Sequence, residues 1–187
     1  ASPVSKNRTI KTLCIGHLSE FSSQDMYVLA SNFDVAVLPN DSAYRYAPLL
    51  KSLNPPIKVF VYKTSRVWRT EPIDNPLNNG VMGYYEIVNS GKGQDWFYAK
   101  QSGSGYLIDP KYPTSHYTRI GSGNFQTAWL AKLVERLNRC SYDGVFFDDT
   151  GEEPEQRSGG EVVVPRIDCW EGQQFLQAVL PSLRARG

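Results

Sequence analysis

Four short apolar runs, separated by stretches of helical periodicity, are the strongest constraint on how this chain can fold. The runs comprise residues 12–18 (TLCIGHL), 33–38 (FDVAVL), 58–62 (KVFVY) and 144–148 (GVFFD). Near-continuous apolar runs of this length are typical of strands buried on both faces, as in a parallel sheet covered by helices. The sequence therefore predicts an α/β protein.

The helical stretches lie between and after these runs. They predict helices after Ser22 or Ser23, over residues 43–53, after Asn124 and over residues 170–184, the last interrupted by Pro181. Right-handed crossovers between successive β/α units make their strands parallel. Two closures are open: a small open sheet, or half of an eight-stranded barrel whose second half is missing from this chain. We expect parallel β/α units in a partial (half) TIM-type barrel.

Residues 64–123 interrupt this pattern with a stretch rich in Pro, Gly, Asn and Tyr that is too long for a plain connection. Within it, residues 84–88 and 96–100 flank the turn-rich segment NSGKGQD, which predicts a β-hairpin inserted after strand 3. A length of 187 residues suits one domain. We therefore expect residues 1–187 to form a single β/α domain, with residues 64–123 as an insertion in it.

The composition indicates a globular protein whose partners are recognised locally. Twenty basic and nineteen acidic residues leave a formal net charge of +1, so no overall field favours nucleic acid or an anionic membrane. No stretch approaches the roughly 20 apolar residues that cross a bilayer, and we expect neither partner. The small residues ASPVS at the amino terminus fit the remainder of a cleaved signal, which leaves the compartment open and favours an extracellular or secreted location over a cytoplasmic one.

The most distinctive polar residues are Asp148 and Asp149, directly after the apolar residues GVFF. Ligands of parallel β/α proteins gather at the carboxyl ends of the strands, which is where these two aspartates lie. Because side chains alternate along a strand, the two carboxyl groups point to opposite faces and do not share one role. In the structural alternative, Asp149 caps the following turn while Asp148 pairs with Lys63 or Arg66.

The segment from Asn124 to Gly151, with its amphipathic helix and the strand YDGVFFDDTG, resembles the glycosyl-hydrolase barrels that carry a DGVFLDD-type fourth strand. The preceding segment QDWFYAKQSGSGYLIDP resembles the aromatic segment and the I/L-D-P turn of the same proteins. Relatives of these barrels include the group similar to endo-α-1,4-polygalactosaminidases. About half of the chain is covered by this likeness to the amino-terminal half of the barrels.

The resemblance implies that Asp148 is a catalytic or substrate-binding acid, that Asp149 is second in line, and that Asp143 is structural. Glycoside cleavage needs two carboxyl groups across the scissile bond. The strands that would ordinarily supply the partner acid are absent, which leaves Asp41, Glu152, Glu153 or another chain as its source. A homodimer or a missing second half-barrel is therefore an expected partner of the chain.

Other residues near the expected strand ends are candidates for binding a carbohydrate substrate. Aromatic rings stack on the flat apolar faces of sugars, and each ring has packing within the insertion as its alternative. His17 is a candidate for proton transfer or substrate binding, against a purely structural role. The candidates are His17, Asp41, Lys63, Trp68, Trp96 and Tyr98.

Three functions compete for this sequence. A glycoside hydrolase acting on a polysaccharide through strand-end carboxylates comes first. The alternatives are a non-catalytic carbohydrate-binding or pseudo-enzyme module, and a metal-dependent phosphoryl-transfer enzyme that uses both aspartates on a cation. The acidic stretch after Asp148 lacks a compact metal-ligand pattern, so we expect no metal and no cofactor.

Overall fold

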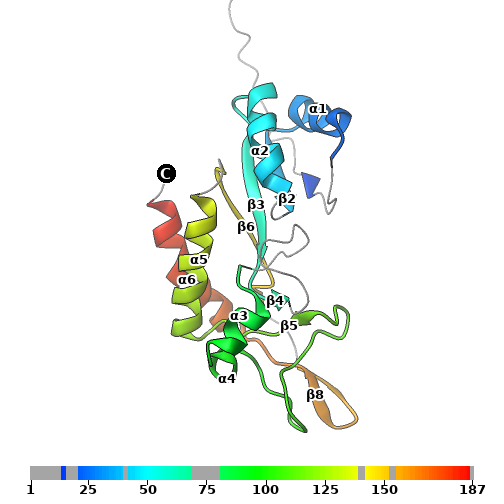
Figure 1. Cartoon of the computed structure of the whole chain (residues 1–187), viewed down its shortest axis with the longest axis vertical. Coiled ribbons are helices and arrows are strands. Elements are labelled where there is room, and N and C mark those ends of the chain that lie inside the picture. Colours follow the sequence, from blue (N-terminus) through cyan, green and yellow to red (C-terminus); the bar gives the residue numbers. More distant parts are fainter. Residues whose placement is uncertain are drawn as a thin grey trace, which may run out of the picture.

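The computed structural model describes residues 14–15, 21–39, 42–68, 81–138, 142–151 and 155–185. Its centre is a four-stranded sheet in the order β1-β2-β3-β6, with every neighbouring pair parallel (Figure 1). The strands are β1 (Cys14–Ile15), β2 (Val35–Pro39), β3 (Lys58–Thr64) and β6 (Gly144–Asp148). A mixed α/β fold with a parallel sheet is thus confirmed, and the strands follow one another across the sheet in chain order.

In the part of the chain that the structure describes, four helices of ten or more residues accompany this sheet: α1 (Ser23–Asn32), α2 (Ser42–Leu53), α5 (Gly123–Leu137) and α6 (Cys169–Arg184). Ser22 and Asp25 exchange hydrogen bonds in a capping box that fixes the start of α1. Asp168 and Glu171 form a second capping box at the start of α6. The expected interruption of this last helix is wrong, because Pro181 lies within its final turn and removes only one late backbone bond.

All four of these helices pack against the same face of the sheet. Val59 shares a buried cluster with α1 and α2 residues, and Phe147 packs against a second cluster that contains α5 and α6 residues. Val61 lies beside Val145, and Lys63 beside Phe147, so the odd-numbered residues of both strands point to this helical face. The opposite face, which carries Phe60, Tyr62, Phe146 and Asp148, has none of the described helices.

The insertion does not contain the hairpin expected from the sequence. Residues 84–88 belong to helix α3 (Tyr84–Asn89), which is followed by the short helix α4 (Gly93–Trp96). Tyr84, Ile87 and Val88 recur at steps of three and four and pack into the larger cluster, which is why a helix forms here. The antiparallel pairs in the insertion instead join β4 (Val67–Trp68) to β5 (Ser115–His116), with single bridges at three further places.

A hairpin is present elsewhere, in the acidic stretch after β6. Strands β7 (Gln156–Ser158) and β8 (Glu161–Val164) pair antiparallel across Gly159 and Gly160. Both glycines have positive φ, 59° and 84°, as a two-residue turn of this kind requires. Part of this acidic stretch is thus a hairpin.

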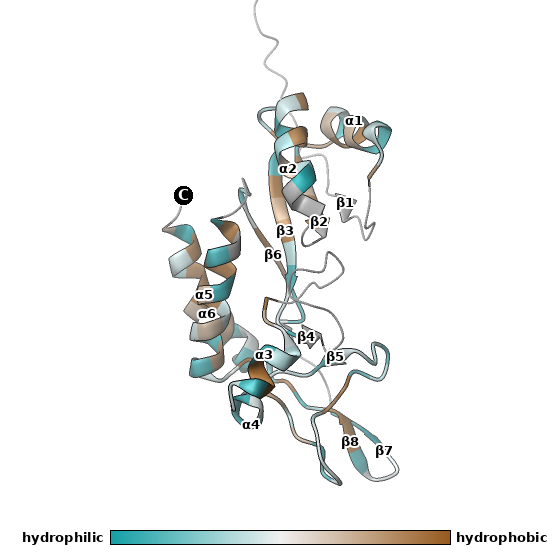
Figure 2. Cartoon of the chain, in the orientation of Figure 1, coloured by the Kyte–Doolittle hydropathy of each residue, from teal (hydrophilic) through white to brown (hydrophobic). Residues whose placement is uncertain are grey.

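Polar character increases toward the carboxyl end of the sheet, as Figure 2 shows along β3. Its residues change from Val59, Phe60 and Val61 to Lys63 and Thr64 over one strand. The same end carries Asp148 on β6, because the two strands are parallel and in register. Among the helices that the structure describes, none is long and apolar enough to cross a membrane.

Candidate functional site

Asp148 is the last residue of β6, and its side chain is exposed on the face of the sheet that carries no described helix. Tyr62, from the neighbouring strand, stacks on Phe146 with ring centroids 5.9 Å apart and donates its hydroxyl hydrogen bond to Asp148 Oδ2. The backbone N–H of Asp149 donates to the other carboxyl oxygen, Oδ1, at 2.8 Å. Both oxygens of Asp148 are thus oriented by fixed donors while the group stays accessible.

The hydroxyl of Tyr62 remains a donor throughout the neutral range. Burial raises the pKa of Tyr62 above its ordinary value of 10.0, and the hydrogen bond and negative charge of Asp148 raise it further. A phenol with a raised pKa stays protonated at neutral pH. Tyr62 therefore orients Asp148 without competing with it for a proton.

Asp149 occupies a backbone conformation that residues other than glycine seldom adopt, with φ of +56°. Its carboxyl group accepts a hydrogen bond from the Thr64 hydroxyl and lies 3.5 Å from Arg66 Nη2. Its backbone oxygen accepts a bond of 2.6 Å from Ser65 Oγ. Contacts from three consecutive residues of the chain therefore maintain the left-handed turn that aims the Asp149 N–H at Asp148.

Two opposing influences act on the carboxyl group of Asp149. Burial raises its pKa above the ordinary value of 3.8, and the neighbouring charge of Asp148 acts in the same direction. Arg66 and the Thr64 hydroxyl lower the pKa, but the net direction is upward. Asp149 and Asp148 thus lie in different environments, as the alternation along the strand predicts.

Arg66 connects this turn to the insertion. Its side chain is only 11% exposed and donates from Nη1 to Asp109, which is itself buried. The guanidinium lies 4.5 Å from the ring centroid of Tyr117, which adds a cation–π contact. Asp109 Oδ1 accepts the backbone N–H of Lys111 at 2.8 Å, so the acid is fixed from its other side. The insertion is thus tied to the strand end through one buried arginine.

The remaining candidates from the sequence do not lie beside Asp148 in this way. Lys63 is 1% exposed and points to the helical face, with Phe147 as its neighbour. Trp96 is 9% exposed and contacts Phe125 edge to face, so it packs within the insertion's core. Tyr98 is half-buried near Glu171; burial, followed by the charge of that carboxyl group, raises its pKa to about 12.

The side chains of three substrate-binding candidates, His17, Asp41 and Trp68, cannot be placed. His17 and Asp41 lie outside the described residues, as do Glu152 and Glu153, two of the possible partner acids. The backbone of Trp68 belongs to β4, but its side chain is outside what the structure describes. Within the described ranges, no group of three or more His, Cys, Asp or Glu side chains is arranged to hold a metal ion.

Sequence reasoning missed Tyr62 and Asp109 as members of the site. Tyr62 shares the face of Asp148 because its register partner is Phe146, two residues before the acid, so alternation could have placed it there. Asp109 belongs to the motif LIDP. This motif indicates a turn, but it does not indicate which residue pairs with Asp109. The pairing of Asp109 with Arg66 joins residues 43 positions apart and follows from no local pattern.

Comparison with sequence families places this chain among glycoside hydrolase-like proteins. The sequence model described as "Hypothetical glycosyl hydrolase family 15" matches residues 51–159, more than half of the chain. The chain belongs to this family. The matched part contains β3, the insertion, α5 and the strand end with Asp148.

Two solved structures resemble the chain: the glycoside hydrolase domain of PelA from Pseudomonas aeruginosa, and a variant of that domain. They are 15% and 16% identical to it, with TM-scores of 0.44 and 0.43. Each comparison covers 74% of this chain and 43% of the other, so the chain spans less than half the length of those structures. No curated protein matches the chain.

Proposed function

We propose that this chain is part of a glycoside hydrolase in which Asp148 is one of the two catalytic carboxyl groups. The observation that carries the proposal is the exposed carboxyl group of Asp148 at the end of β6, with both oxygens oriented by Tyr62 and the Asp149 N–H. Hydrolysis of a glycosidic bond requires such a group at a defined place beside the bond. Membership of a glycosyl hydrolase family supports the same reaction class.

In this proposal, Asp149 positions Asp148 and is not itself the acid that reacts. Its carboxyl group is engaged by Thr64 and Arg66, and its contribution to Asp148 is a backbone N–H. The sequence suggests both Asp148 and Asp149 as catalytic acids, and this proposal keeps only Asp148 in that role. The second carboxyl group then comes from Asp41, Glu152 or Glu153, or from outside this chain.

We further propose that the sheet is half of a (β/α) barrel. A doubly wound open sheet has helices on both faces and a reversal of strand order, whereas a barrel has its helices outside and its strands in sequence. The described helices lie on one face, and the strand order follows the chain. The face that carries Tyr62 and Asp148 would then be the barrel interior, completed by a second half-barrel or by a second copy of the chain.

The substrate in this proposal is a polysaccharide, as for the endo-α-1,4-polygalactosaminidase-like group that the strand resembles. A panel of polysaccharides that includes galactosaminan, galactan and chitosan should be incubated with the wild type and with Asp148→Asn, and reducing ends counted. We expect the wild type, alone or completed by a second half-barrel, to cleave at least one polymer, and Asp148→Asn under the same conditions to lose at least about 100-fold in rate. Glu161→Gln, which changes an exposed carboxyl group on β8, is the matched control and should keep its activity.

Two outcomes would contradict the proposal. Equal rates for the wild type and Asp148→Asn would exclude Asp148 from the chemistry. Binding of a polymer without turnover in any form, even after addition of a second half-barrel, would favour the non-catalytic carbohydrate-binding module instead.

A further inference from the structure

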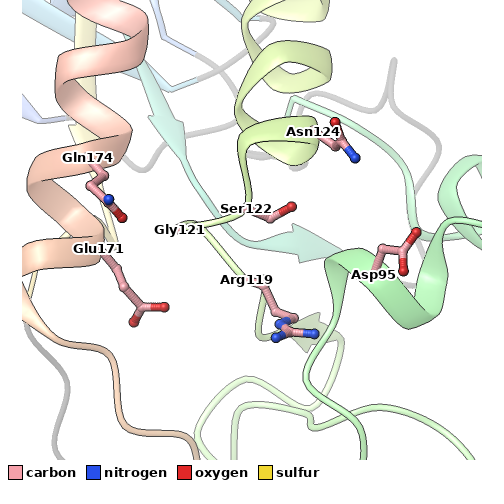
Figure 3. Close-up of a pocket in the computed structure, with 7 residues that line it drawn as sticks. All are labelled: Asp95, Arg119, Gly121, Ser122, Asn124, Glu171 and Gln174. Carbon is pink, nitrogen blue, oxygen red and sulfur yellow. The ribbon is translucent and has the colours of Figure 1, made fainter.

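A polar pocket of about 500 Å³ lies away from Asp148, where the first turns of α5 and α6 meet α4. Figure 3 shows its side chains arriving from three directions: from α6, from the segment that enters α5, and from α4. The side chains that line it are Asp95, Arg119, Ser122, Asn124, Glu171 and Gln174. Its volume falls within the range of small-ligand sites.

Two lining residues, Gly121 and Glu171, approach each other closely. A Cβ atom at Gly121 would lie 3.1 Å from Cγ of Glu171, so a larger residue at this position would press against that side chain. Glu171 is fixed by the capping box of α6, in which its Oε2 accepts the Asp168 N–H at 3.2 Å. On the other side, Arg119 N–H donates to the Trp96 carbonyl at 2.8 Å, which joins the α4 segment to the entry of α5.

The chemistry of the lining disfavours anionic and apolar ligands. Two carboxyl groups and one guanidinium are accompanied by a hydroxyl and two amides, so donors and acceptors are mixed and no apolar side chain is present. An anion would be attracted by Arg119 but repelled by Asp95 and Glu171, and an apolar peptide would find no surface to bury. A neutral ligand with many hydroxyl groups can both donate to the carboxyl groups and accept from the guanidinium and amides.

An aromatic ring next to the pocket adds to this match. The half-buried Tyr98 hydrogen-bonds through its hydroxyl to Glu171, so it lies next to one of the lining side chains. Rings beside polar clusters are suited to the apolar faces of sugars. The sequence singles out Tyr98 as a candidate for sugar binding on independent grounds.

The pocket lies at the same end of the sheet as Asp148 but on the helical side. Helix α5 ends before β6 begins, so its first turn is at the carboxyl end of that strand. Gly172, next to Glu171 in α6, approaches the backbone oxygen of Thr150, two residues beyond Asp148. The pocket and Asp148 thus lie at the same end of β6, on opposite faces of the sheet.

We propose that this pocket binds a neutral sugar unit of a glycan, as a second carbohydrate site separate from Asp148. A site of this size made of exposed hydrogen-bonding groups should bind one unit with a millimolar Kd. The proposal takes its choice of probes from the proposed function, but the binding needs no turnover.

The test is a titration of the whole chain, followed by amide NMR, with three tetrasaccharides: neutral tetra-N-acetylchitotetraose, its cationic de-N-acetylated form and anionic tetragalacturonate. We expect the neutral probe to shift the amides of Gly121, Ser122 and Asn124. Gln174→Ala and Ser122→Ala should each weaken binding by about threefold to tenfold, as expected for a lost hydrogen bond. Gln173→Ala is the matched control: Gln173 is exposed, adjacent on α6 and not part of the pocket, so affinity should not change.

Each remaining outcome is decisive. Absence of shifts at these amides, or equal affinities of Gln174→Ala and Gln173→Ala, would overturn the second site. Tighter binding of the anionic or the cationic probe would overturn the assignment to neutral sugars. Asp148→Asn should keep the amide shifts, so loss of cleavage in that variant leaves this inference standing, and binding of the probes by a chain that cleaves nothing would refute only the proposed function.

Discussion

At the opposite end of β6 from Asp148, the carboxyl group of Asp143 is held by hydrogen-bond donors. Asp143, just before the strand, accepts hydrogen bonds from Lys51 Nζ at 2.6 Å, Lys58 Nζ at 3.2 Å and Val59 N at 2.9 Å. Burial by itself raises the pKa of Asp143, but these three donors outweigh it and the net pKa is lowered. The structural role implied for Asp143 by the family resemblance agrees with these contacts.

Replacement of Asp143 by Asn should therefore change how stability depends on pH. Because its pKa is lower in the folded chain than the ordinary 3.8, the ionised group stabilises the fold above that value, and the contribution is lost as pH falls through the folded pKa. We expect Asp143→Asn to cost about 1–2 kcal/mol at pH 7 and progressively less below about pH 4. Urea unfolding at a series of pH values measures this, and parallel curves for the two proteins would contradict it.

Asp149 should show the opposite dependence. Its pKa is raised in the fold, so its contribution to stability is complete below the ordinary 3.8 and is lost as pH rises through the folded pKa. Relative to Asp149→Asn, the wild type should therefore lose stability as pH rises above about 4. The same unfolding series tests this prediction, and a wild type that gains stability over Asp149→Asn in that range would refute it.

Two substitutions at Asp149 distinguish the effect of its side-chain contacts from the effect of its left-handed backbone conformation. Asn tolerates positive φ better than most residues, and its amide oxygen can still accept from Thr64. Ala would lose that bond and the contact with Arg66, and it has no polar side chain to offset the strain of a positive φ by hydrogen bonding. We expect Asp149→Ala to cost about 2–3 kcal/mol in unfolding free energy and Asp149→Asn clearly less. Equal losses would show that the backbone conformation has no part in the effect.

At the scale of elements, hydrophobic runs predicted the strands better than they predicted the insertion. The run GVFFD is β6 residue for residue, and α5 begins at Gly123, one residue before the predicted cap. These elements bury an apolar face against the sheet, so their periodicity is strong. Residues 84–89 gave a weaker signal, because a helix of six residues presents few apolar positions and the following turn residues also suit a hairpin.

The candidate site could be predicted only as far as its residues lie on the paired strands β3 and β6. Asp148 follows from strand-end logic, and Tyr62 from alternation once the register of β3 and β6 is known. The contacts of Arg66 with Asp109 and Asp149 join three segments far apart in the sequence. Such pairings depend on how the insertion packs, which no local pattern encodes.

The contact between α6 and the turn after β6 yields a prediction for this element. An alanine at Gly172, inside α6, would ordinarily stabilise the helix, but its Cβ would collide with the backbone oxygen of Thr150. We expect Gly172→Ala to cost about 1–3 kcal/mol through this overpacking. Gly123→Ala is the matched control, because a Cβ there meets no atom within 4 Å and should change stability by less than about 0.5 kcal/mol. Thermal unfolding of both variants measures the difference, and equal melting temperatures would argue against the contact.

At the scale of the whole molecule, the parallel sheet is covered on one face only by the described helices. Two buried clusters lie on that face, one under α1 and α2 and one joining α5, α6 and the insertion. The other face presents Phe60, Tyr62 and Phe146, all half-buried, and β6 has no further strand beside it among the described residues. An apolar face next to a free strand edge favours association with another sheet.

This asymmetry predicts that the two neighbouring phenylalanines of β6 respond differently to a charge. Phe147 packs against Trp129 and Phe175 on the helical face, so Phe147→Lys should unfold the chain because it buries an unpaired charge. Phe146→Lys places the charge on the other face, and we expect it to keep the fold while abolishing self-association of the chain or its binding to a second half-barrel. Circular dichroism and sedimentation velocity across a range of concentrations measure the two effects. A wild type that stays monomeric and binds no hydrophobic dye would contradict the barrel closure and favour a small open sheet, because a barrel half must leave its interior face to be covered by another chain segment.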